Sequence, residues 1–172
     1  MSDMENVDFI VGIKGEFWDK RPMYKITIDG DEVYPPTEFN LASGQIKEVK
    51  VSKAFPVNTN SGAIPGVLRV HFLNKEPSDT KKDQYDNPDK FEIVADMLLT
   101  VTGLEIDGIV LPVGSDFSLS EDVGYYELEE PVTYQGESDV KTIPGCNVMG
   151  WNGAYCFNFK TPIYVWILDQ FK

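Results

Sequence analysis

The stretch Leu68-Arg-Val-His-Phe72 (LRVHF) alternates apolar and polar side chains with a period of two. In an extended chain, Leu68, Val70 and Phe72 would point to one face, and the arginine and histidine between them to the other. This alternation is typical of a β-strand with one face buried and the other in water. The stretch therefore predicts a strand at the edge of a hydrophobic core.

The same pattern recurs on both sides of this strand. Period-two runs occupy residues 9–14, 24–28, 48–52, 68–72, 99–101 and 104–107. Two of the runs end at Asp-Gly or at Gly, which are strong tight-turn signals, and no long stretch has apolar residues at helical spacing. The 11 prolines and 14 glycines also suit strands and turns better than helices. We therefore predict an all-β protein with an antiparallel β-sandwich or jelly-roll fold.

A change in composition near Leu111-Pro-Val-Gly-Ser-Asp116 divides the chain. Residues 1–111 carry most of the alternating runs and are predicted to form the β-sandwich. Residues 112–172 are more acidic and richer in aromatic residues, and are predicted to form a C-terminal β region. This region is either a small subdomain or a set of strands that completes the first sandwich. The apolar run Ile163–Leu168 (IYVWIL), with Pro162 before it, is interpreted as the last strand.

Charge limits the classes of partner. The sequence has 28 acidic residues against 15 lysines and arginines, a net charge of −13. Nucleic acids and anionic membranes are disfavoured as partners, because binding them requires clustered basic residues. The N-terminal sequence MSDMENVDFI lacks the basic and apolar regions of a signal peptide, and no apolar run approaches the length of a membrane span. Without an export signal, Cys146 and Cys156 are expected to be reduced thiols rather than a disulfide across a hairpin.

Catalytic motifs are missing from the sequence. It contains no G-x-S-x-G, P-loop, G-x-G-x-x-G or H-E-x-x-H pattern. The single histidine, His71, is predicted to lie on the outward face of a strand rather than beside a nucleophile. A carboxylate pair of the glycosidase type cannot be singled out among 28 acids. We therefore expect a protein that is not an enzyme.

Aromatic residues provide candidates for ligand binding. Flat rings pack against the C–H faces of sugars, while carboxylates and amides pair with the hydroxyl groups. Trp18, Tyr24, Trp151 and Tyr155 are the candidates, since Asp19, Asn147 and Asn152 lie near them in the sequence. The alternative is that these rings fill the core or an interface, because each buries a large area.

A polar segment, residues 72–90, provides the candidates for a cation site. Asp83, Asp86 and Asp89 recur every third residue, but this is not an EF-hand pattern. Four lysines leave the segment close to neutral. We interpret it as a solvated loop between strands and keep weak calcium binding at the three aspartates as an alternative; no cofactor is otherwise expected.

Two segments around this loop resemble a known family. Val67–Asn74 (VLRVHFLN) and Met97–Ile109 (MLLTVTGLEIDGI) are similar to the end of a calcium-dependent, xylan-binding carbohydrate-binding module. The resemblance implies a β-sandwich jelly roll with a non-catalytic binding role, and domains of this kind also occur in virion proteins of tailed bacteriophages. The chain departs from the family at two calcium-ligand positions, where it has Lys75 and Thr102, and this argues against the family's metal site.

Two functional hypotheses follow. The first is a non-catalytic virion structural or assembly protein, such as a decoration, tail or fibre component. It would bind other virion proteins in multiple copies, and its location would be the virion, assembled in the host cytoplasm. The second is a carbohydrate-binding module that recognises a surface glycan through exposed Trp or Tyr, with or without calcium.

Overall fold

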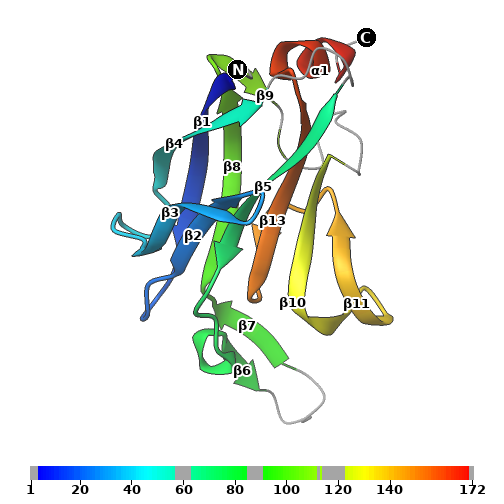
Figure 1. Cartoon of the computed structure of the whole chain (residues 1–172). Helices are drawn as coiled ribbons and strands as arrows, with labels where there is room; N and C mark the ends of the chain where they lie inside the picture. Colours follow the sequence, from blue (N-terminus) through cyan, green and yellow to red (C-terminus); the bar gives the residue numbers. More distant parts are fainter. Residues whose placement is uncertain (1–3, 57–62, 85–90, 112, 114–122, 171–172) are drawn as a thin grey trace.

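The computed structural model describes residues 4–56, 63–84, 91–111, 113 and 123–170. Its described strands form two stacked sheets and a small separate hairpin, and every pairing between them is antiparallel (Figure 1). The predicted all-β antiparallel sandwich is confirmed.

The first sheet has the strand order β12-β8-β1-β4, and β9 also pairs with β8. Its strands are β1 (Met4–Glu16), β4 (Ile46–Pro56), β8 (Leu98–Ile106), β9 (Ile109–Leu111) and β12 (Val148–Met149). The second sheet has the order β11-β10-β13-β5-β2-β3. Its strands are β2 (Met23–Ile28), β3 (Asp31–Glu38), β5 (Ile64–Phe72), β10 (Gly124–Tyr134), β11 (Glu137–Pro144) and β13 (Gly153–Thr161).

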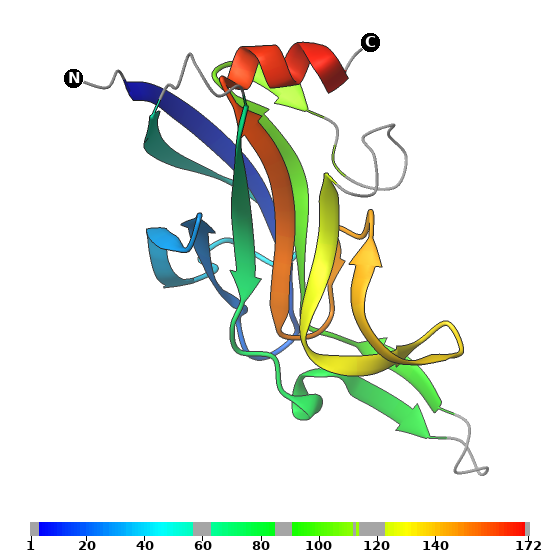
Figure 2. The ribbon, with the colours of Figure 1, turned by 45° about the vertical axis from the view of Figure 1, so that its right-hand side comes forward.

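The polar segment forms a projecting hairpin. A short 3-10 helix, η1 (Pro77–Asp79), leads into β6 (Lys81–Gln84), which pairs with β7 (Phe91–Ala95). Figures 1 and 2 show this hairpin extending beyond one end of the sandwich, near the turn between β10 and β11.

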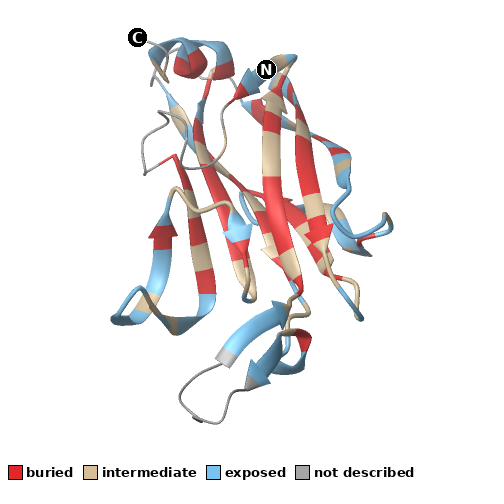
Figure 3. Cartoon of the chain, turned by 180° about the vertical axis from the view of Figure 1, so that it is seen from behind, coloured by how far each residue is buried: buried red, intermediate tan, exposed pale blue. Residues whose placement is uncertain are grey.

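The alternating residues of the two sheets meet in one core. The strand quoted first is β5, and its Leu68, Val70 and Phe72 are buried as predicted. The rings of Phe9 on β1 and Phe159 on β13 lie 5.5 Å apart and join the two sheets. Figure 3 shows the buried residues running along the sandwich strands, whereas the β6–β7 hairpin is mostly exposed.

A β-bulge adjusts the register of β8. Gly12 pairs with Gly103 but the next residue, Ile13, pairs with Val101, so Thr102 is the extra residue. The bulge lets Val101 and Leu104, three residues apart, both face the core. The position where the family resemblance implies a calcium ligand is thus a bulge between two paired strands.

The C-terminal region contributes to the same sheet as the N-terminal region. Strand β13 lies between β10 on one side and β5 on the other, with nine aligned residue pairs to β5. Residues from both predicted ranges therefore share one hydrogen-bonded sheet and one core.

The prediction of a last strand at residues 163–168 is wrong. The segment is the helix α1 (Ile163–Gln170), which follows Pro162. Ile163, Trp166 and Ile167 are buried at positions i, i+3 and i+4, and the Trp166 ring meets Phe157 edge-on at 5.6 Å. A short apolar run fits both periods, and here the helical period places three large side chains on the end of the core. None of the helices in the described part of the chain is long and apolar enough to cross a membrane.

Candidate functional site, a groove around Trp151

A groove of about 760 Å³ is lined by residues of the β6–β7 hairpin, of the β10–β11 hairpin and of the segment around β12. Its volume lies in the range of ordinary ligand pockets. The apolar lining comes from Ile93, Leu98, Val132, Tyr134, Ile143, Val148 and Trp151. The polar lining includes Glu76, Lys82, Asp96, Glu129, Glu130 and Asn152. An apolar wall with a few polar groups is the usual composition of a small-molecule site.

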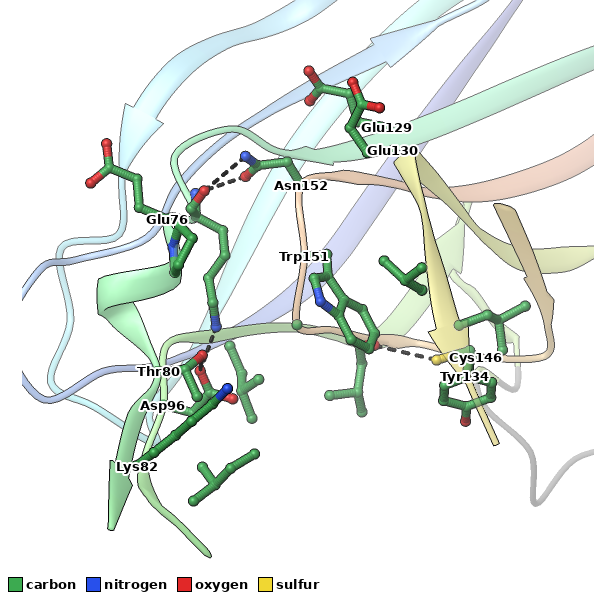
Figure 4. Close-up of a pocket in the computed structure, with 18 residues that line it drawn as sticks. Glu76, Thr80, Lys82, Asp96, Glu129, Glu130, Tyr134, Cys146, Trp151 and Asn152 are labelled. Atoms are coloured by element: carbon green, nitrogen blue, oxygen red, sulfur yellow. Dashed lines mark hydrogen bonds and ion pairs between the residues drawn. The ribbon is translucent and has the colours of Figure 1, made fainter. Parts of the chain in front are cut away.

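Trp151 stands in the middle of this groove, between β12 and β13 (Figure 4). It is 41% exposed, so part of a large apolar side chain faces the groove. Its backbone is held on both sides. The buried Tyr126 hydroxyl donates to the Trp151 carbonyl and accepts the Trp151 N–H at 3.0 Å. Burial raises the pKa of Tyr126, so the hydroxyl keeps its proton for this bond.

Asn152 connects Trp151 to the opposite wall of the groove. Its side-chain oxygen accepts the Lys75 N–H at 2.7 Å, and its amide nitrogen donates to the Lys75 carbonyl at 2.9 Å. The exposed indole is thus carried by a backbone segment with fixed neighbours. A rigid platform loses little conformational entropy when a ligand binds.

Lys75 has a structural role at the base of the hairpin. Its ammonium group donates to Asp96 and, at 2.6 Å, to the Met97 carbonyl, and its side chain is only 7% exposed. Thr80 donates to the same Asp96 carboxylate at 2.8 Å. The lysine that occupies a calcium-ligand position in the resemblance therefore neutralises a groove carboxylate with its own positive charge.

An irregular segment of β10 forms the acidic rim of the groove. Glu127 pairs with Thr142, but the next pair toward the turn is Val132 with Val140, so residues 128–131 have no aligned partner in β11, although Leu128 still pairs with Gly153 of β13. Glu129 and Glu130 lie in this segment and are exposed, and Figure 4 shows their carboxylates close together and pointing away from the Trp151 indole. From the sequence, both residues belong only to a C-terminal region that is acidic as a whole, because a bulge of this kind leaves no pattern in the sequence.

Of the four aromatic candidates, Trp151 alone lines this groove. Trp18 is also exposed, at 47%, but its indole N–H donates to the Asp79 carbonyl at 2.9 Å, outside the groove lining. Tyr24 and Tyr155 are corrections to the predicted set. They are 0% and 3% exposed, so neither has a ring face available to a ligand. Each lies two positions from a core residue of its own strand and therefore faces the core with it.

The remaining predicted polar residues lie elsewhere. Asn147 donates to the Val101 carbonyl and thereby joins β12 to β8. His71 accompanies Thr27 on the outer face of the second sheet, 2.9 Å from the threonine hydroxyl. Burial, with smaller effects of Lys25 and Arg69, lowers the pKa of His71 to about 4.

Both cysteines are unpaired thiols. Cys146 lines the groove, where its thiol donates to the Val148 carbonyl at 3.3 Å and burial raises its pKa. Cys156 is fully buried in β13. A raised pKa keeps a thiol protonated and poorly nucleophilic.

Only one of the three aspartates proposed as cation ligands lies among the described residues. Asp83 is exposed on β6, whereas Asp86 and Asp89 lie outside the described residues. Within residues 4–56, 63–84, 91–111, 113 and 123–170, no group of three metal-binding side chains comes together. Calcium binding at these aspartates stays a prediction.

Comparison with known proteins gives structural likeness without sequence likeness. The sequence matches no protein-family model, and a search of curated proteins finds no match. The structure of vCBM60 in complex with galactobiose has a TM-score of 0.49 and 12% identity, covering 88% of this chain and 98% of that chain. The selenomethionine form of vCBM60, from work on two families of calcium-dependent carbohydrate binding modules, has a TM-score of 0.46 and 12% identity, covering 88% and 89%. Both TM-scores are below 0.5, and the function proposed next rests on the groove alone.

Proposed function

We propose that this protein is a non-catalytic binding module that takes a short oligosaccharide in the groove around Trp151. The observation that carries the proposal is the exposed indole of Trp151 on a backbone held by Tyr126 and Asn152. A sugar ring presents a flat C–H face to such an indole. Covering half of a Trp side chain contributes on the order of 1–3 kcal/mol.

The groove wall supplies the polar partners that a saccharide needs. Glu129 and Glu130 offer carboxylate oxygens as acceptors, and Lys82 offers ammonium hydrogens as donors. The apolar lining between them, with Leu98 and Val148, excludes water from the same surface. This combination suits a ligand with alternating C–H faces and hydroxyl groups.

A binding role fits the chemistry of the groove better than a hydrolytic one. His71 is the only histidine in the sequence. It is not among the residues that line the groove, and its ring is hydrogen-bonded to the Thr27 hydroxyl. The groove thiol, Cys146, has a raised pKa and no histidine beside it among the lining residues. A nucleophilic mechanism needs a base next to its nucleophile.

A glycan array with three proteins tests the proposal. Wild type should bind a subset of saccharides, and Trp151→Ala should weaken that binding by about tenfold or more, consistent with the loss of 1–3 kcal/mol. Trp18→Ala is the matched control, since it removes an equally exposed indole outside the groove, and it should bind like wild type. The pattern should be the same with calcium and with a chelator, because Lys75 already neutralises Asp96. Equal loss in both variants, or no binding by wild type, would contradict the proposal.

A second candidate function is docking on another protein, as in a virion or another assembly. The helix α1 favours it, because Tyr164, Val165 and Leu168 are 51%, 59% and 70% exposed on the side away from the core. Figure 1 shows α1 at the same end of the sandwich as β9, whose Val110 is 72% exposed. Several exposed apolar side chains at one end of a molecule are typical of an interaction surface.

Mass measurement by light scattering, with and without candidate particle proteins, tests this second function. Complex formation by wild type that is lost in a Val165→Ser/Leu168→Ser variant would support it. A monomer that stays unbound at high concentration with every particle component would exclude it. The same double variant should keep the glycan-array pattern, which separates the two functions.

A further inference from the structure

We infer that two copies of this chain associate through the edge strand β4, antiparallel and in one defined register, so that their first sheets join into a single sheet. The inference is independent of the saccharide groove, since no residue of β4 lines it. It follows from the regular backbone of β4 and from two charged side chains on its exposed face.

The edges of the two sheets differ in how they are protected. Natural β-proteins block an edge strand with prolines, bulges or short length, because its unpaired N–H and C=O groups otherwise bind a further strand. In the second sheet, β3 contains Pro35 and Pro36, which lack a backbone N–H. At the other edge of that sheet, β11 has Asp139 at a positive φ and shifts its register twice against β10. In the first sheet, β12 is only two residues long.

β4 has none of these features. Its eleven residues, Ile46–Pro56, pair with β1 without a shift of register. None of them has a positive φ, and the one proline, Pro56, is the last residue. On the side away from β1, no backbone hydrogen bond joins β4 to another part of the described chain. β4 is therefore a long, regular edge strand with a row of backbone donors and acceptors that a further strand can use.

Two charges on the exposed face of β4 have no partner within their own copy. Glu48 and Lys50 are both exposed, and on β1 they lie opposite Gly12 and Ile10, which carry no charged side chain. Neither forms an ion pair within the described part of the chain. The free side of the strand is therefore where these two charges can meet a partner.

The side chains of β4 allow only certain registers with a second β4. Residues directly opposite each other in an antiparallel pair point to the same face, and β4 alternates between exposed and buried residues from Glu48 to Ser52. A symmetric pair of identical strands must then have its two-fold axis at a residue, which lies opposite its own copy. This pairing uses the free edge of both copies, so association stops at the dimer.

Charge distinguishes the possible registers. When Val49 lies opposite the partner's Val49, Glu48 lies opposite the partner's Lys50, and the symmetry repeats this pair. With the axis at Glu48 or at Lys50, two like charges face each other, and with the axis at Val51 neither charge meets its opposite. Cross-strand pairs of opposite charge stabilise a sheet, and like charges destabilise it. The register centred on Val49 is therefore favoured over its neighbours.

The other lysines of β4 are held within the chain. Lysines on an edge strand usually discourage pairing. Here Lys47 donates to the Asn40 side chain at 3.0 Å, and Lys53 donates to the Asp31 carboxylate at 2.7 Å. Both ammonium groups therefore have partners in their own copy. The association is expected to be weak, because one strand from each copy forms the contact and its ion pairs are exposed to water.

Sedimentation equilibrium of the full chain tests the inference, at pH 7, with a reductant and at protein concentrations up to about 1 mM. Wild type should show a monomer–dimer equilibrium. Glu48→Lys and Lys50→Glu should each weaken the dimer by about tenfold or more, because each change replaces two attractive pairs by two repulsive ones. An equimolar mixture of these two variants should restore the dimer, since the mixed pair again places opposite charges face to face. The double variant Glu48→Lys/Lys50→Glu should dimerise like wild type.

Matched changes on another edge are the control. Glu137→Lys and Lys141→Glu make the same charge changes at exposed positions of β11, and each should leave the dimer as it is in wild type. Mixing these two variants should add nothing. A wild-type chain that stays monomeric at about 1 mM, a dimer that survives Glu48→Lys, or a mixture that fails to restore the dimer would overturn the inference. Species larger than a dimer would contradict the closed pairing.

Discussion

Trp151 is the residue on which the proposed function depends, and its position could be predicted only in part. The sequence pointed to it as an aromatic residue beside Asn152. It could not show that Tyr126, 25 positions earlier, holds its backbone. The choice of Tyr24 and Tyr155 was wrong for a reason visible in the sequence. Both belong to alternating apolar runs, and the alternation itself assigns them to the core face.

The first prediction at this scale concerns Tyr126. Tyr126→Phe leaves the Trp151 N–H and carbonyl without their buried partner, which should cost about 1–2 kcal/mol in unfolding free energy. It should also weaken saccharide binding several-fold, because the indole is less firmly placed. Chemical denaturation and calorimetry measure the two effects. Tyr134→Phe, which removes a more exposed hydroxyl from the same strand, should change stability by less than about 0.5 kcal/mol. Wild-type saccharide affinity in Tyr126→Phe would refute the role of Tyr126.

The second residue prediction concerns pH. The folded state holds the pKa of His71 at about 4, below the ordinary value of 6.5. Between these values the unfolded state binds more protons, so stability is full above pH 6.5 and falls as the pH decreases toward 4. The contribution is on the order of 1–3 kcal/mol. Urea denaturation at pH 4.5 and 7.5 should therefore show a smaller pH effect in His71→Gln than in wild type. Equal effects in the two proteins would show that carboxylates alone cause the loss.

At the scale of elements, tight turns were the most predictable feature. Ile28-Asp-Gly30 and Ile106-Asp-Gly108 each end a strand, and both Asp-Gly pairs have positive φ. In each turn the aspartate also accepts a backbone N–H from another strand, Val67 in one case and Asp8 in the other, both at 2.8 Å. The sequence could predict these turns because the constraint is local. It could not predict α1, because six apolar residues fit a strand as well as a helix until the core they cover is known.

Glycine substitutions test the turns. Gly30 and Gly108 have φ near +85° and open space where a Cβ would lie. Gly30→Ala and Gly108→Ala should each cost about 1 kcal/mol, entirely from the backbone. Gly103→Ala is the matched control, since it also meets open space but lacks a positive φ, and it should be neutral or stabilise by up to about 1 kcal/mol. Thermal denaturation of the three variants measures these changes in stability. A loss of stability in Gly103→Ala equal to that in the other two variants would contradict this explanation.

At the scale of the whole molecule, β13 brings residues from both predicted ranges into one of the two sheets. The change in composition near residue 112 was a real feature of the sequence, but strand pairing does not follow composition. Pairing between β13 and β5 joins residues almost a hundred positions apart, for example Thr161 with Ile64. Such long-range pairing has no local signal, so the sequence left open whether residues 112–172 complete the sandwich.

This arrangement predicts cooperative unfolding. The full chain should melt in a single calorimetric transition, because its strands share one core. A fragment of residues 1–111 should not fold, since it lacks the strand that covers one edge of β5 and the Phe157 and Phe159 rings. Far-ultraviolet circular dichroism of the fragment is the check. Two separate transitions, or a folded fragment, would establish two independent domains.

The central claim is that saccharide contacts the indole of Trp151, and nuclear magnetic resonance measures this directly. The chain has three tryptophans, so a ¹⁵N-labelled sample gives three indole N–H signals, assigned by the variants Trp18→Phe, Trp151→Phe and Trp166→Phe. On addition of a saccharide identified by the glycan array, the Trp151 signal should move in proportion to occupancy. The signals of Trp18, outside the groove lining, and of Trp166, 7% exposed, should stay in place. Movement of the Trp18 signal alone, or of none of the three at saturating saccharide, would contradict the account.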